Sequence, residues 1–473
     1  MTRSTEQWAG QEFAGAQLGD IRRTRRLVAM AARAAHRPAG KVSVVFDRTE
    51  EREGAYDLLE SDLAPAQAIA ESMFSATAAR VGTDRVVYVS IDLTGLTLSD
   101  LARTKGFDPI GSPNRPARGL MVANAFAVGR DGIPLGLIDQ RYWARDEPEA
   151  MSRTERVKRN QHRSFSTKQS AYFVRAAENA IRRLAVKDAV PWVIIDREGD
   201  NQDILLSLSE MACAFTVRAS RNRKLIADDD ERQVRESLAR QRALGKWEVA
   251  VGRTGKRAAR VATVEVRAKQ VDLKFNTRPG MTARHLKLYA VSVRESGPIA
   301  QRSGALDWML YTNIPVTTAD AASQIIEAYR ARWRVEEFHR TWKLGECDVE
   351  SAQLRSIDAV IKWATILAAV ATRIERLKYL SRTQPDLPAS VELEPIEIEA
   401  LKIERRDRKK RQKPVLPEMP TLAEATRWIA EIGGWMGEKS SGSITIARGL
   451  DRLAIYTHAL TVVRAEGRKR PRR

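Results

Sequence analysis

The sequence predicts a mixed α/β fold in which a sheet-containing core is flanked by helical regions at both ends of the chain. Apolar residues recur at helical spacing in the first 70 residues and again from Trp363 onward. Between these regions lie β-branched runs that are typical of strands. The 473 residues suffice for two or three domains. We therefore expect a helical domain at 1–72, a mixed α/β domain at 73–381, and a linker with a helical domain at 382–473.

The charge balance points to a polyanionic partner. Lys and Arg number 80 against 60 Asp and Glu, so the net charge is +20. A surplus of this size favours nucleic acid, held through its phosphates. An anionic membrane surface is the competing partner, but the longest apolar run, Trp363–Thr372, is far shorter than the roughly 18 to 20 residues of a membrane span. We therefore expect no membrane association.

The N-terminal segment and the cysteines narrow the class of protein further. Residues 1–13 contain no apolar signal-peptide core, so we expect a cytoplasmic protein. Cys213 and Cys347 stand alone, without a CxxC motif or a paired histidine. This argues against a disulfide framework and against structural zinc.

A basic amphipathic helix is predicted after Asp20, which is a suitable N-cap residue. A solvated helix is the alternative, but the dense arginines, continued by Arg37, favour a surface that faces DNA. A further helix is expected to begin near Ala64-Pro65-Ala66. The apolar stripe of the basic helix consists of Leu27, Met30, Ala31 and Ala34, and its candidate DNA-binding residues, with one lysine just beyond, are Arg22, Arg23, Arg26 and Lys41.

Strand patterns begin near residue 85. Residues 85–92 form a β-branched run that ends in Asp92, and the turn-like residues 93–95 follow. Residues 120–128 and 135–143 are two more strand candidates, joined by the hairpin signal Gly-Arg-Asp-Gly. Three successive strands predict an antiparallel meander. A polar and basic stretch, residues 147–168, then reads as a loop.

The next segments combine a helix with further strands. A helical pattern covers 171–184, and Trp192–Asp196 is a short apolar strand of the kind buried in a mixed sheet, again ending in an aspartate. Strand patterns dominate residues 213–314. We interpret this block as an all-β insertion in an α/β domain, followed by a helix that begins near Thr318.

The stretch from Tyr329 to Lys343 carries a polar stripe. On one continuous helix, at about 100° per residue, Tyr329, Arg332, Glu336 and Lys343 share an arc of about 60°. This face combines a potential metal ligand with groups that grip phosphate. An exposed face with ion pairs is the alternative, because Arg332 and Glu336 are also spaced i, i+4.

Three carboxylates complete the pattern. Asp92 and Asp196 end strands, and Glu336 lies on a later helix. Such a set can hold two Mg²⁺ ions, because substrate phosphate and water supply the remaining oxygen ligands. Each aspartate alone is more commonly a turn or cap residue, so the hypothesis depends on all three acids together with the helix.

With these motifs the sequence resembles the insertion-sequence-four family of bacterial cut-and-paste transposases. These enzymes belong to the Asp-Asp-Glu class. The most specific match is the Tyr-x2-Arg-x3-Glu-x6-Lys signature at Tyr329–Lys343. The resemblance implies a ribonuclease-H-like core and covers nearly the whole chain. Its other motifs are Leu18–Thr24, Glu53–Tyr56, Asp196–Glu198 and, in the expected dimerisation region, Gly433–Met436.

The resemblance also implies roles for residues. Asp92, Asp196 and Glu336 correspond to the metal-binding triad, with Mg²⁺ as the cofactor and Mn²⁺ as its substitute. Trp308 lies where such enzymes stack a flipped base, which needs a flat apolar partner; a buried core tryptophan is the alternative. The implied phosphate-contacting residues are Tyr329, Arg332, Lys343 and Arg218.

The implied reaction has four steps at one site. Water nicks each transposon end, and the freed 3′ hydroxyl attacks the opposite strand to form a hairpin. A second water opens the hairpin, and the 3′ hydroxyl joins target DNA. The implied partners are terminal inverted repeats, target DNA and a second copy of the chain, within the nucleoid when DNA is bound. Two rival functions are a catalytically silent DNA-binding repressor and a Mg²⁺-dependent structure-selective nuclease.

Overall fold

The computed structural model describes residues 3–83, 85–100, 103, 105–110, 117–144, 152, 154–155, 164–226, 233–252, 258–275, 284–297, 304–408, 415–437 and 440–469. The chain divides into two compact units. The first contains Met1–Thr83, Leu93–Glu149 and Arg334–Arg473, and the second contains Asp84–Asp92 and Ala150–Trp333. Most of the predicted polar loop at 147–168 lies outside the described residues; its end forms a short 3-10 helix, η1 (Phe165–Thr167).

The first unit begins with a group of helices, as the sequence predicted. Asp20 caps α2, because its Oδ1 atom accepts a hydrogen bond of 2.8 Å from the Arg22 amide. The predicted apolar stripe of α2 is buried, from Leu27 to Ala34. Pro65 precedes α5, which confirms the predicted start of that helix. The bounds are α1 (Arg3–Phe13), α2 (Ile21–His36), α3 (Val42–Val45), α4 (Thr49–Glu60) and α5 (Ala66–Ala79).

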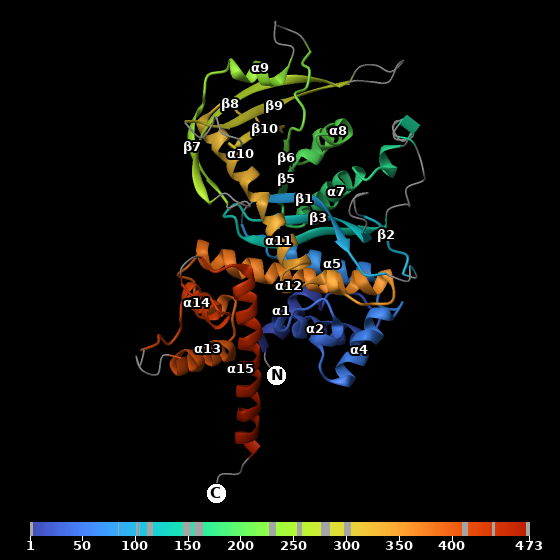
Figure 1. Cartoon of the computed structure of the whole chain (residues 1–473), viewed down its shortest axis with the longest axis vertical. Helices are drawn as coiled ribbons and strands as arrows, with labels where there is room; N and C mark the ends of the chain where they lie inside the picture. Colours follow the sequence, from blue (N-terminus) through green and yellow to red (C-terminus); the bar gives the residue numbers. More distant parts are fainter. Residues whose placement is uncertain are drawn as a thin grey trace. The chain divides into compact units, whose positions relative to one another are not determined.

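The long helix α12 (Ile357–Thr383) is the centre of the first unit. It packs against α2, α4, α5 and the hairpin strand β4, so it is buried on nearly all sides (Figure 1). Lys362, on α12, donates to the carbonyl oxygens of Leu59 and Ser61 at 3.1 and 2.8 Å. These carbonyls belong to the C-terminal end of α4, whose last groups lack partners within the helix. The contact therefore ties the N-terminal helices to α12.

A β-hairpin in the first unit also confirms its prediction. Strands β3 (Arg118–Val128) and β4 (Pro134–Trp143) pair in antiparallel register. Gly132 in the turn has φ of +81°, which explains why the turn needs a glycine. The short strand β2 (Asp108–Pro109) pairs with β3.

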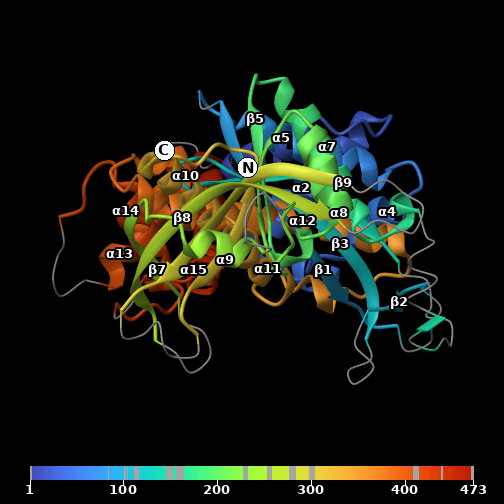
Figure 2. The ribbon, with the colours of Figure 1, turned by 90° about the horizontal axis from the view of Figure 1, so that it is seen from above.

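The second unit is built on a mixed sheet. Strands β5 (Val190–Ile195) and β6 (Ala214–Arg218) extend β1 (Val86–Thr97) in parallel, and β10 (Asp307–Thr312) is antiparallel to β6. The whole strand order is β2-β3-β1-β5-β6-β10-β9-β8-β7, with β4 on β3. Figure 2 shows β8 and β9 as long curved strands. The other elements are η2 (Arg197–Gly199), α7 (Ala171–Ala185), α8 (Gln202–Glu210), α9 (Val234–Ala239), β7 (Gly245–Val251), β8 (Arg260–Phe275), β9 (Arg284–Glu295) and α10 (Ala319–Ala331).

Three boundaries differ from the prediction. Strand β1 does not end at Asp92 but continues to Thr97, because β3 remains its neighbour and Leu96 is buried. Residues 213–314 are not entirely strand, because α9 lies within them and packs on β8 and β9. The strands β7, β8 and β9 of this block belong to the same sheet as β1 and β5, to which β6 and β10 connect them.

The third difference concerns the helix that carries the polar stripe. The chain forms α10, then a break at Arg332, then α11 (Trp333–Lys343). The Arg332 amide bonds to the Tyr329 carbonyl, three residues back, instead of the carbonyl four residues back. Such a tightened turn interrupts the regular α-helical ladder. Arg332 nevertheless keeps right-handed helical dihedrals, with φ of −52° and ψ of −35°, so the shared face stays a prediction.

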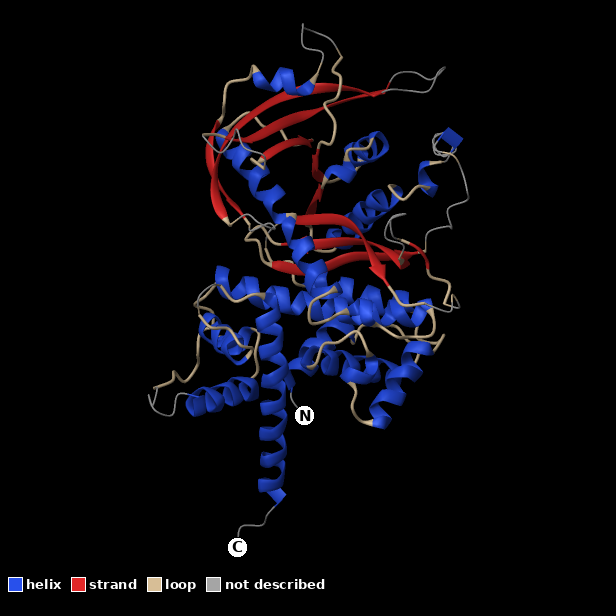
Figure 3. Ribbon diagram, in the orientation of Figure 1, coloured by secondary structure: helices blue, strands red, loops and turns tan. Residues whose placement is uncertain are grey.

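The C-terminal region is helical, as expected. The elements after α11 are η4 (Val349–Ser351), α12, η5 (Ala389–Val391), α13 (Pro395–Arg408), α14 (Leu422–Ile432) and α15 (Ser443–Lys469). Helix α14 starts with a capping box between Thr421 and Glu424, and Gly433 is its C-cap residue. Figure 3 shows α15 as one long helix. Within the described part of the chain, no helix is both long and apolar enough to span a bilayer.

Helices α14 and α15 approach closely through glycines, which gives a stability prediction. A Cβ atom at Gly449 would lie 1.9 Å from the Ile429 carbonyl oxygen. We expect Gly449→Ala to lower the free energy of unfolding by at least about 1–3 kcal/mol, the usual cost of overpacking. Thermal or urea unfolding measures this. The control is Gly10→Ala in α1, where nothing lies within 4 Å and stability should hold or rise. Equal stability of the two variants would contradict the packing argument.

Candidate active site

The two candidate aspartates lie side by side on neighbouring parallel strands, Asp92 within β1 and Asp196 just after β5. Ile91 on β1 pairs with Ile195 on β5, so Asp92 and Asp196 each come directly after this pair. Both side chains are half-buried. Asp196 also caps η2, because its Oδ1 atom accepts a hydrogen bond of 2.8 Å from the Glu198 amide. Asp196 therefore does act as a cap residue, which was the alternative to a metal-binding role. Capping does not move it away from the end of β5.

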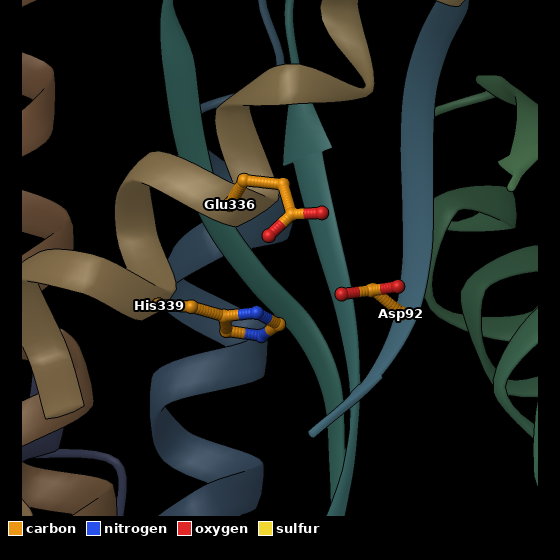
Figure 4. A group of neighbouring side chains, drawn as sticks. All are labelled: Asp92, Glu336 and His339. Carbon is orange, nitrogen blue, oxygen red and sulfur yellow. The ribbon is translucent and has the colours of Figure 1, made fainter. Parts of the chain in front are cut away.

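A group of possible metal ligands contains Asp92, Glu336 and His339. One ligand atom from each residue lies within 4.8 Å of the others. Figure 4 shows both carboxylates and the imidazole pointing toward one another. Carboxylate oxygens are suitable ligands for Mg²⁺, and this spacing lets them reach a single cation. Among the described residues Asp196 is outside this group. The structure therefore gathers two of the three predicted acids around one point.

His339 is the functional candidate that the sequence reasoning missed. It lies three residues after Glu336 on α11, a spacing that places both side chains on neighbouring parts of the helix surface. Its ring is buried, and its Nε2 atom lies 2.9 Å from the Asn124 amide nitrogen. The i, i+3 spacing of a histidine and a candidate ligand was the signal that could have revealed it.

Four other predicted residues gather in the second unit around Tyr329. The Tyr329 ring meets the edge of Trp308, with ring centroids 4.9 Å apart. Burial raises the pKa of the Tyr329 hydroxyl, while the charges of Arg218 and Arg332 partly oppose this shift. The negative charge of Asp196 raises this pKa further, so Asp196 lies close enough to the cluster to affect it electrostatically.

The cations of this cluster are partly held in place. Arg218 donates to the Asp307 carbonyl oxygen at 3.1 Å. The Arg332 guanidinium lies over the Trp333 ring, 5.8 Å from its centroid. Both arginines are half-buried, whereas Tyr329 is only 5% exposed. A phosphate could therefore reach the guanidinium groups more readily than the tyrosine hydroxyl.

Lys343 has its own surroundings in the first unit. Its Nζ atom donates to Thr94 Oγ1 at 3.1 Å and lies 3.5 Å from Glu350 Oε1. Thr94 lies on the part of β1 beyond Asp92. The unexpected extension of β1 thus supplies a partner for the signature lysine.

The predicted DNA-binding residues near the N-terminus differ in exposure. Arg22 and Arg26 are exposed on α2, and Lys41 is exposed before α3. Arg23 is half-buried and donates to the Leu18 carbonyl oxygen at 2.8 Å, so it supports the chain before α2. Their contact with DNA stays a prediction.

Family models match three successive parts of the chain. Residues 5–64 match a transposase DNA-binding family, and residues 160–373 match a transposase DDE domain. Residues 369–468 match the dimerisation domain of the Tn5 transposase. The matched DDE segment includes Asp196 and Glu336, and the mixed sheet with flanking helices agrees with its ribonuclease-H-like fold. The resemblance inferred from sequence motifs is therefore confirmed, and the chain belongs to the Tn5-like DDE transposases.

Proposed function

We propose that this transposase cuts the ends of its own mobile element by hydrolysis and hairpin formation and joins the 3′ ends to target DNA. The observation that carries the proposal is the convergence of Asp92 and Glu336, with ligand atoms inside one 4.8 Å group. Matches to DNA-binding, DDE and dimerisation families along the chain support the same function.

The carboxylates would hold divalent cations. Asp92, Asp196 and Glu336 offer anionic oxygens, which suit Mg²⁺ and also Mn²⁺. When bound, two such ions activate the attacking oxygen and stabilise the leaving oxygen of an in-line displacement. In our proposal β1 carries Asp92, α11 carries Glu336, and Asp196 directly follows the last residue of β5.

The cluster around Tyr329 would bind the DNA strand that reacts. Arg218 and Arg332 supply guanidinium groups that match phosphate oxygens in geometry and charge. Trp308 is half-buried, so part of its surface is accessible for stacking against a flipped base. Tyr329 packs against the tryptophan ring in a T-shaped arrangement. In this proposal Lys343 contacts a further phosphate near the cut end.

The flanking regions would supply end recognition and pairing of subunits. Exposed arginines of α2 fall inside the matched DNA-binding segment, and the net charge of +20 favours a polyanion. Helix α15 carries exposed apolar residues within the matched dimerisation segment, among them Ile455, Val462 and Val463. We infer a homodimer in which each subunit binds one terminal inverted repeat and cuts the other.

The role of Glu336 gives the first functional prediction. We expect Glu336→Ala to lower Mg²⁺-dependent nicking of terminal-repeat DNA by about 100-fold or more, because it removes fixed charge stabilisation at the reacting centre. DNA binding, measured by gel shift, should persist. Glu327→Ala, an exposed glutamate on α10, is the control and should nick normally. Parallel loss of binding would make Glu336 structural. Binding without nicking by the unaltered protein would favour the silent repressor.

The arginines of α2 give a second prediction. Replacing Arg22 and Arg26 by alanine should weaken binding to terminal-repeat DNA and reduce the salt slope of the affinity by about 0.9 for each lost phosphate contact. Fluorescence anisotropy at several salt concentrations measures both quantities. Lys187→Ala, an exposed lysine after α7, serves as the control. An unchanged salt slope would remove α2 from the DNA interface.

Trp308 gives a third prediction, because stacking should matter for hairpin formation more than for the first nick. We expect Trp308→Ala to lower the hairpin yield strongly, with base–aromatic stacking contributing about 1–3 kcal/mol. Nicking of the same DNA should fall much less, and Trp308→Phe should restore part of the hairpin. Denaturing gels resolve the two products. An equal loss of both steps, together with lower thermal stability, would instead mark a core tryptophan.

A further inference from the structure

Three buried polar side chains lead from the β3–β4 hairpin to the helix that carries Glu336. Asn124 on β3 pairs directly with Gln140 on β4, and His339 lies on α11. Gln140 Nε2 donates to Asn124 Oδ1 at 2.8 Å, and the Asn124 amide nitrogen lies 2.9 Å from His339 Nε2. The exposed fractions of Asn124, Gln140 and His339 are 0%, 7% and 6%. The two contacts share Asn124 and so connect all three side chains. Each of these buried side chains thereby has a hydrogen-bond partner.

The chain of hydrogen bonds has a direction. The Asn124 oxygen accepts from Gln140, so the Asn124 NH₂ group faces His339, and an NH₂ group can only donate. His339 Nε2 is then the acceptor, and the proton of the neutral ring lies on Nδ1. A ring nitrogen that carries a proton offers no lone pair to a metal. It can instead donate to a carboxylate.

The opposite orientation of both amides is less favourable. In the orientation described, Gln140 Oε1 is buried without a hydrogen-bond partner. Reversing both amides would place the Gln140 NH₂ there and leave its two donors unpaired. Buried donors without partners are rarer than buried acceptors without partners. The hairpin therefore selects the ring tautomer in which Nδ1 is the donor.

We propose that His339 is a positioning residue that orients the Glu336 carboxylate through its Nδ1–H, with Asn124 and Gln140 fixing the tautomer. Figure 4 shows a ring nitrogen of His339 facing the side chain of Glu336, and the two residues share the group of possible ligands. Partners of this kind orient metal ligands and typically change metal affinity 10- to 100-fold when they are removed. The inference rests on the proposed role of Glu336 as a metal ligand.

Metal binding by the full-length protein tests the inference without relying on cleavage. We expect His339→Phe to weaken Mn²⁺ binding, measured by electron paramagnetic resonance, by about 10- to 100-fold. Asn124→Leu should weaken it in the same direction. Because Asn124 acts only through the ring, the double variant should bind Mn²⁺ no more weakly than His339→Phe alone. His339→Gln, whose amide keeps a donor, should recover part of the affinity.

Glu336→Ala separates this inference from the proposed function. If Glu336→Ala loses Mn²⁺ and His339→Phe keeps full affinity, the positioning role is wrong and the metal role of Glu336 stands. If Glu336→Ala keeps full affinity, the metal role itself falls. Thermal unfolding without metal tests whether His339 is only structural. In that case its variants would lose stability while their Mn²⁺ affinity stayed unchanged, and the positioning role would be wrong. A strong ¹⁴N coupling to Mn²⁺ that disappears in His339→Phe would show direct ligation and overturn the positioning role.

Discussion

The register between β1 and β5 is the constraint on which the candidate active site depends. These strands run parallel, and Val89 and Ile91 of β1 and Val193 and Ile195 of β5 are all buried. Both faces of these strands are buried, so a slip of one residue would move every side chain to a face packed for a different residue, and close packing specifies the register. Asp92 and Asp196 need no contact of their own to be placed together, because the apolar pairs before them fix both positions.

The helix that carries Glu336 is held by buried polar contacts on its other side. Glu375 of α12 accepts hydrogen bonds from Thr341 of α11 and from Ser443 at the start of α15, at 2.5 and 2.6 Å. Lys378 forms an ion pair with Glu375 and lies 3.5 Å from Glu337. Such pairs add little net stability, but removing one partner from a buried pair costs about 3–5 kcal/mol. The network therefore fixes α11 against α12 and joins both helices to the region matched by the dimerisation family.

Local sequence patterns predicted the helices and strands and the residue types of the site. Features that depend on contacts between distant residues, such as the extension of β1 and the role of His339, could not be predicted in this way. The cap at Asp20, the strand before Asp196 and the helix start after Pro65 each follow from a few adjacent residues, and all three are present. The extension of β1 beyond Asp92 depends on β3, a neighbour about 25 residues later in the chain. The partner Asn124 of His339 lies about 200 residues earlier, so the spacing from Glu336 could mark His339 as a candidate but could not assign its role.

The break at Arg332 falls inside the Tyr-Arg-Glu-Lys signature. Its residues are divided between two helices, because α10 ends at Ala331 and α11 begins at Trp333. Tyr329 packs with Trp308, whereas Lys343 meets Thr94. The boundary between the two compact units also falls between Trp333 and Arg334. The signature therefore spans two helices, with Tyr329 on α10, Arg332 at the turn, and Glu336 and Lys343 on α11.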